Sequence, residues 1–118
     1  MSGVSVNNPG ISYDDAGFGI PLIFIHGVTE SKNAFYYQSS GLQDDYRIIA
    51  YDLRLGLKNP QEYALDLLID DLKRFLDSVN IGSAIICGHS FGALIAMKFS
   101  MMYPDYARAL VLISAYAA

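Results

Sequence analysis

The sequence predicts an α/β protein with a mostly parallel sheet of about six strands and helices on both faces. Three short runs, at residues 21–25, 84–87 and 109–113, are continuously apolar, which is typical of strands buried on both faces. Segments with helical spacing separate these runs, and this alternation favours a parallel sheet. With 118 residues, of which 53% are hydrophobic and 17% charged, we expect residues 1–118 to form a single domain.

The first half of the chain predicts a hairpin and two central strands. Residues 4–6 and 11–14 are expected to pair across a turn at positions 7–10, where asparagine, proline and glycine gather. The strand at 21–25 ends at His26-Gly27, and residues 31–42 are expected to be helical. The strand at 46–51 is followed by Asp52.

The second half begins with a predicted amphipathic helix. Asn59 is expected to cap it, Pro60 to be its first residue, and Asn80 and Gly82 to end it. Its apolar residues recur every three or four positions and form one stripe: Leu65, Leu68, Leu72, Phe75, Leu76 and Val79.

A glycine-serine-glycine turn follows the strand at 84–87. Residues 88–92 read Gly-His-Ser-Phe-Gly, and an almost wholly apolar helix runs from there to about residue 103. We expect Met97, Met101 and Met102 to pack in the core. After a turn at residues 104–105, residues 109–113 form the last predicted strand.

Polar residues stand where three predicted strands end. Ligands of parallel sheets bind beyond the carboxyl ends of the strands, and those ends carry His26-Gly27, Asp52 and Ser90. The sequence therefore places its chemistry at that edge of the sheet.

Taken together, these motifs resemble the α/β-hydrolases of the esterase and haloperoxidase-like branch. The match covers nearly the whole chain, in order: Gly17-x-Gly19-x-Pro21, His26-Gly27, Tyr51-Asp52-x-Arg54, Gly88-x-Ser90-x-Gly92 and Tyr103-Pro104-Asp105. The resemblance implies that Ser90 is the nucleophile, on the strained strand-to-helix turn of this fold. It also implies that the backbone N–H groups of Val28 and Phe91 form the oxyanion hole.

The resemblance covers the N-terminal half of such a fold. In the family, the triad acid and histidine follow the serine in the chain, and we expect them after Ala118. A second departure lies at Arg54-Leu55-Gly56-Leu57, where the family has Arg-Gly-x-Gly.

The catalytic base is left open by the sequence. The family keeps a histidine at position 26 that braces the oxyanion loop, which is one role for His26. The other is a substitute base oriented by Asp52, because the strands ending at these residues and at Ser90 are neighbours in this fold. His89 is expected to pack or hydrogen-bond beside its strand.

The function that follows is that of a serine hydrolase acting on small carboxylic esters. The alternative is a non-catalytic module that folds or associates without activity. No motif implies a metal or another cofactor. The net charge of −4 argues against nucleic acid as a partner.

The remaining expectations concern location and assembly. We find neither a signal peptide nor a membrane span, and Cys87 is the only cysteine, so a cytoplasmic protein is expected. The uncharged apolar run at 109–113 predicts a homo-oligomer paired through an exposed edge strand.

Overall fold

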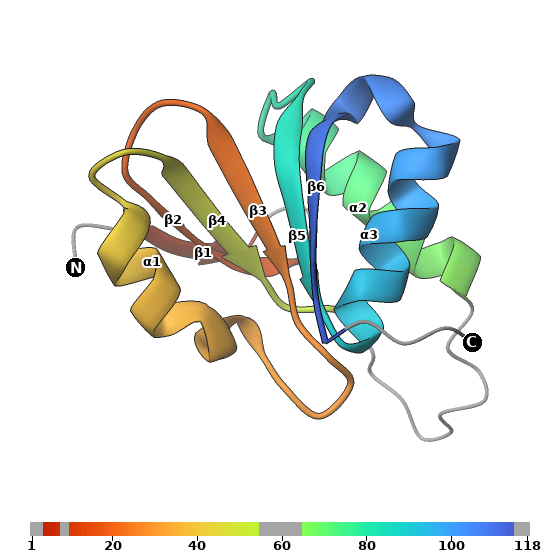
Figure 1. The fold of residues 1–118 in the computed structure, drawn as a ribbon, viewed down its shortest axis with the longest axis horizontal. Helices are drawn as coiled ribbons and strands as arrows, with labels where there is room; N and C mark the ends of the chain where they lie inside the picture. Colours follow the sequence, from red (N-terminus) through yellow and green to blue (C-terminus); the bar gives the residue numbers. More distant parts are fainter. Residues whose placement is uncertain (1–3, 8–9, 55–64, 115–118) are drawn as a thin grey trace.

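The computed structural model describes residues 4–7, 10–54 and 65–114. Its strands form one six-stranded sheet in the order β1-β2-β4-β3-β5-β6 (Figure 1). The strands are β1 (Val4–Asn7), β2 (Ser12–Ala16), β3 (Pro21–Ile25), β4 (Arg47–Tyr51), β5 (Ala84–His89) and β6 (Ala107–Ile113). The helical segments are η1 (Lys32–Phe35), α1 (Tyr36–Leu42), α2 (Leu65–Ser78), α3 (Phe91–Met102) and η3 (Pro104–Tyr106). The predicted fold class is confirmed.

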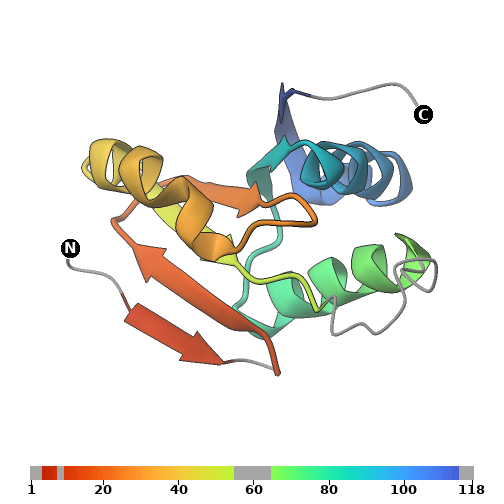
Figure 2. The same cartoon turned by 90° about the horizontal axis from the view of Figure 1, so that it is seen from below.

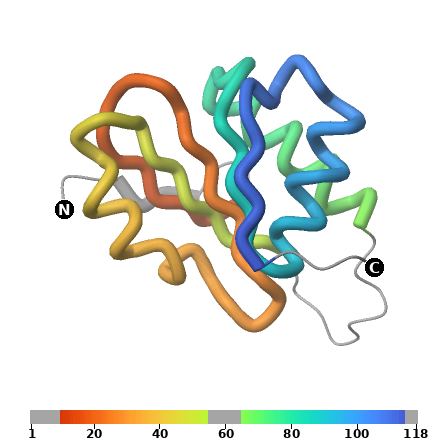
Figure 3. Tube along the Cα trace, viewed as in Figure 1, coloured from red at the N-terminus to blue at the C-terminus, as the bar shows by residue number. Residues whose placement is uncertain are grey.

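Strand direction divides the sheet into two parts. β1 pairs with β2, and β2 with β4, in antiparallel fashion, so the predicted N-terminal hairpin is present. β4, β3, β5 and β6 are all parallel to one another. β3 has β4 on one side and β5 on the other, although β5 lies some sixty positions later in the chain (Figure 3). Such a reversal of strand order opens a crevice at the carboxyl ends of the strands.

Helices cover both faces of the sheet (Figure 2). α1 lies on one side, and α2 and α3 lie on the other. Side chains alternate between the faces along each strand. Leu22 and Phe24 of β3 therefore belong to the core cluster that also contains Phe35, whereas Ile23 and Ile25 pack in the larger cluster beneath α2 and α3.

α2 presents the predicted stripe to the larger cluster. The ring of Phe75 is fully buried and contacts the rings of Tyr13 and Tyr51 at centroid distances of 4.9 and 5.3 Å. Asn80, just after the helix, has φ 61°, in the left-handed region that asparagine tolerates at a helix end. The predicted cap and first turn at residues 59–62 lie outside the described residues.

α3 is less buried than its composition suggested. Its small and aromatic face, which includes Ala93, Ala96 and Phe99, is fully buried. Met101 and Met102 are 76% and 54% exposed, so the prediction that they pack in the core is wrong. They lie in the last turn of the helix, where its inward face is taken by Phe99, whose ring contacts that of Tyr103.

β6 is the terminal strand of the described sheet. It is two residues longer at its start than predicted, and among the described residues only one of its edges is paired, with β5. Four consecutive apolar side chains are each about 40% exposed: Leu110, Val111, Leu112 and Ile113.

Candidate active site

Ser90 lies in a strained turn between β5 and α3. Its φ and ψ are 59° and −118°, a backbone conformation that residues other than glycine rarely adopt and that costs about 1–3 kcal/mol. Two backbone hydrogen bonds hold the turn in this conformation. The Ser90 N–H donates to the Ile113 carbonyl at 3.0 Å, and the Ala93 N–H donates to the Ser90 carbonyl at 2.9 Å. Strain held in this way is typical of functional sites.

Two close backbone contacts require the glycines on either side of Ser90. A Cβ at Gly88 would lie 2.2 Å from the carbonyl oxygen of Gly92, and one at Gly92 would lie 2.0 Å from that of Ile25. The tight turn therefore depends on both glycines, and the start of α3 rests directly on the end of β3.

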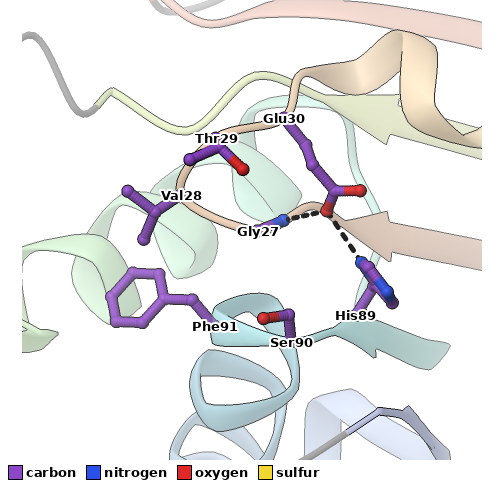
Figure 4. A pocket seen from close by; sticks show the side chains of 7 residues that line it. All are labelled: Gly27, Val28, Thr29, Glu30, His89, Ser90 and Phe91. Carbon is purple, nitrogen blue, oxygen red and sulfur yellow. Dashed lines mark hydrogen bonds and ion pairs between the residues drawn. The ribbon is translucent and has the colours of Figure 1, made fainter.

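The loop after β3 faces Ser90 across a small cavity of about 270 Å³ (Figure 4). Its lining residues come from that loop and from the turn: Gly27, Val28, Thr29, Glu30, His89, Ser90 and Phe91. Figure 4 shows the Ser90 hydroxyl directed toward the Phe91 side of the cavity and away from the His89 ring. Val28 and Phe91, the two residues implied to supply oxyanion donors, line the same cavity as Ser90.

The ring of His26 is buried behind this loop, with 2% of the residue exposed. Its Nδ1 lies 2.6 Å from the Gly27 carbonyl oxygen, and its Nε2 lies 2.9 Å from the Leu53 nitrogen. Because the Leu53 N–H can only donate, Nε2 is the acceptor and Nδ1 carries the proton. Both ring nitrogens are therefore occupied by backbone groups, which favours the loop-bracing role over that of a base.

Asp52 serves the same loop region. Its Oδ1 accepts a hydrogen bond from the Lys32 N–H at 2.7 Å and lies 4.0 Å from His26 Nε2. The Asp52 carboxylate thus ties the start of η1 to the end of β4. It does not orient the His26 ring through a hydrogen bond, since Leu53 occupies Nε2.

Glu30 was missed by the sequence analysis and is one of the residues that line this cavity. Its Oε1 accepts hydrogen bonds from the Gly27 N–H at 2.7 Å and from His89 Nδ1 at 2.8 Å. Burial disfavours the charged carboxylate, but these two bonds and the charge interactions with His89 and His26 together outweigh it, so the pKa of Glu30 lies below its usual range. The neighbouring ends of β3 and β5 were the one signal that could have paired Glu30 with His89 beforehand.

A second cavity of about 250 Å³ adjoins the first on the α1 side. Glu30 and His89 line both cavities, and the second is completed by Ala34, Phe35, Gln38 and Ile113. The Glu30–His89 hydrogen bond therefore stands between the two spaces.

Comparison with known proteins identifies the family to which this fold belongs. The family model of the α/β hydrolase fold matches residues 20–118. The chain belongs to this family. The α/β-hydrolase resemblance of its motifs is thereby confirmed.

This α/β-hydrolase is similar to curated proteins of differing activity. It is 34% identical over 102 residues to human epoxide hydrolase 4, covering 81% of this chain and 28% of that protein. It is 30% identical over 105 residues to the sn-1-specific diacylglycerol lipase ABHD11 of Danio rerio, covering 86% of this chain and 33% of that protein. The chain thus spans a third or less of the length of these relatives.

Solved structures agree on the fold. Epoxide hydrolase VrEH1 from Vigna radiata superposes with a TM-score of 0.86 at 24% identity, covering 99% of this chain and 39% of that one. At this identity the likeness concerns the fold alone.

Two further observations concern the part of the chain that the structure describes. No helix in it is long and apolar enough to cross a membrane. No group of three or more histidine, cysteine, aspartate or glutamate side chains in it could hold a metal ion.

Cys87 is 3% exposed, and burial raises the pKa of its thiol to about 11, which makes it a poor nucleophile at neutral pH.

Proposed function

We propose that this chain carries the nucleophile and oxyanion hole of a serine hydrolase acting on small carboxylic esters. The observation that carries the proposal is the strained backbone of Ser90, φ 59° and ψ −118°, at the reversal of strand order and beside the loop of Val28. A serine that serves only as a turn residue has no need of this strain, because glycine adopts positive φ without it.

In the proposed reaction, Ser90 Oγ adds to the ester carbonyl carbon while its proton passes to a base. The carbonyl oxygen becomes an oxyanion, which accepts hydrogen bonds from the N–H groups of Val28 and Phe91. Collapse of this intermediate breaks the acyl carbon–oxygen bond and releases the alcohol, which takes up the proton. Water then hydrolyses the acyl-serine ester by the same steps and restores Ser90.

Esters fit this nucleophile better than epoxides, although epoxide hydrolases are among the similar proteins. A serine hydroxyl that opened an epoxide would form an ether. An ether has no carbonyl that oxyanion donors could polarise, so the enzyme would remain alkylated. An acyl-serine ester has such a carbonyl and can turn over.

The base is expected to come from outside residues 1–118. The chain has two histidines. His26 has both ring nitrogens on backbone groups, and His89 is bonded to Glu30 with the Ser90 hydroxyl turned away from it. This arrangement also favours the second candidate function, a module that keeps the hydrolase core without turning over substrate.

Covalent labelling tests whether Ser90 is reactive in this chain, because it requires attack by the serine but no turnover. We expect a fluorophosphonate probe to add once to the chain, with peptide mapping placing the adduct on Ser90. Ser90→Ala should abolish the adduct. Ser100→Ala changes another serine, within helix α3, and should leave the adduct unchanged. An unlabelled wild-type chain at high probe concentration would favour the non-catalytic module.

A further inference from the structure

The hydrogen bonds of Glu30 join two segments that are far apart in the chain. Gly27 belongs to the loop after β3, and His89 is the last residue of β5, 59 positions after Glu30. One carboxylate oxygen, Oε1, accepts from both. We propose that Glu30 is a positioning residue that fixes the oxyanion loop against the serine turn, with His89 as its anchor.

The loop's own turn is closed by one backbone hydrogen bond, and His26 holds the carbonyl side of Gly27. The Glu30 N–H donates to the Gly27 carbonyl at 3.1 Å, which closes a four-residue turn over residues 27–30. The Glu30 side chain then folds back over this turn to the Gly27 N–H. A Cβ on Gly27 would lie 2.9 Å from Oε1 and 3.4 Å from the Cβ of Ser90. The Glu30 carboxylate, the loop backbone and Ser90 are therefore close neighbours at Gly27.

The two hydrogen bonds to Glu30 Oε1, which we call the strut, are suited to holding the loop in a fixed position. A carboxylate bond to an N–H is roughly twice as strong as a neutral hydrogen bond, and both partners here are N–H donors. The side chains of Glu30 and His89 are 28% and 33% exposed, so water competes with these bonds only in part. The lowered pKa of Glu30 agrees with a carboxylate that stays charged in this position.

What the strut positions is the Val28 N–H, which follows Gly27 directly. The Phe91 N–H is held by the serine turn, whereas that of Val28 depends on the loop. Oxyanion donors act well only when both lie at about 2.7–3.1 Å from the developing charge. By tying Gly27 to His89, the residue before Ser90, Glu30 sets the spacing of the two donors. This role rests on the proposed function of Ser90.

The test compares three variants by the second-order rate of fluorophosphonate labelling of Ser90. We expect Glu30→Ala to slow labelling about 10- to 100-fold, less than the 10²–10³-fold typical for complete loss of a donor. Glu30→Gln should restore the rate to within about threefold, because the amide oxygen can accept both bonds. Asp44→Ala is the control, since Asp44 is an exposed carboxylate at the opposite end of the sheet. Wild-type labelling by Glu30→Ala, or no rescue by glutamine, would overturn the proposal.

A second pair of variants approaches the strut from the other side. His89→Asn keeps an N–H donor near the position of Nδ1, and His89→Phe removes it. We expect labelling to slow for phenylalanine only, and the Glu30→Ala/His89→Phe double variant to be no slower than Glu30→Ala alone. Additive losses would mean that the two residues act independently. The two single His89 variants also decide the question if Glu30→Ala does not fold.

Amide hydrogen exchange separates this proposal from that of the nucleophile. The Gly27 N–H should be protected in the wild-type chain and in Glu30→Gln, and exchange at least tenfold faster in Glu30→Ala, even if Ser90 does not label. Free exchange of the Gly27 N–H in the wild-type chain would exclude the strut. Protection without labelling would exclude only the nucleophile.

Discussion

Replacing Gly92 with alanine tests the contact on which the serine turn is built. The added Cβ would lie 2.0 Å from the carbonyl oxygen of Ile25, 2.6 Å from its carbonyl carbon and 2.7 Å from the His26 carbonyl oxygen. All three atoms belong to the backbone of β3 and its end. α3 and β3 must therefore separate by at least about 1 Å, and a close-packed interior resists such a shift.

The magnitude follows from two opposing contributions. Overpacking a core costs about 1–3 kcal/mol when side chains can adjust, and we take about 3 kcal/mol here because both partners are backbone. Alanine within a helix is favoured over glycine by about 1 kcal/mol. The net expectation is a loss of about 2 kcal/mol in the free energy of unfolding, which corresponds to a melting temperature lower by about 10 °C.

Gly41→Ala is the matched control. Gly41 also lies in a helix, α1, but a Cβ there would meet nothing within 4 Å. This variant should gain up to about 1 kcal/mol. Urea denaturation followed by circular dichroism gives both values, provided that the m-values agree. If Gly92→Ala were as stable as the wild-type chain, the close approach of α3 to β3 would be refuted.

Three further outcomes are expected. Because the folded pKa of Glu30 is lowered, the stabilisation by its carboxylate is present above the unfolded pKa, near 4.3, and is lost as pH falls through the folded value. Glu30→Gln should therefore reduce the loss of folding stability at acidic pH. An unchanged dependence of stability on pH would contradict this. With a thiol pKa of about 11, Cys87 should react with iodoacetamide at pH 8 only after urea unfolding, so rapid modification of the native chain would count against its burial. Light scattering should give about twice the chain mass of 13.0 kDa if β6 pairs with a second copy, and Val111→Lys should yield monomer; a 13.0 kDa species for both would exclude this dimer.

Local patterns were sufficient to predict most of the fold. Continuous apolar runs identified the central strands, and the spacing of Leu68, Leu72 and Phe75 identified α2, because buried strands and one-sided helices impose distinct periods. The exposure of Met101 and Met102 was not predictable in this way. A helix that is apolar all round gives no indication of which face the sheet covers.

In the candidate site, too, only the residues that belong to a local sequence pattern could be predicted. Ser90 and its glycines form one contiguous motif, so the turn is encoded within five residues. The interactions of Glu30 depend on β3 and β5 lying side by side, which no local pattern states. The two roles left open for His26 likewise needed the position of the Leu53 N–H, a backbone group that gives no sequence signal.

The hydrogen bond from the Ser90 N–H to the Ile113 carbonyl connects the outermost described strand, β6, to the strained serine turn. Separation of β6 from β5 at Ile113 would break this bond and let the turn relax out of its strained conformation. Any segment that pairs along the open edge of β6 would suppress that separation. If Ser90 is the nucleophile and a partner pairs at this edge, the two events would be thermodynamically linked, without any contact between the partner and the cavity.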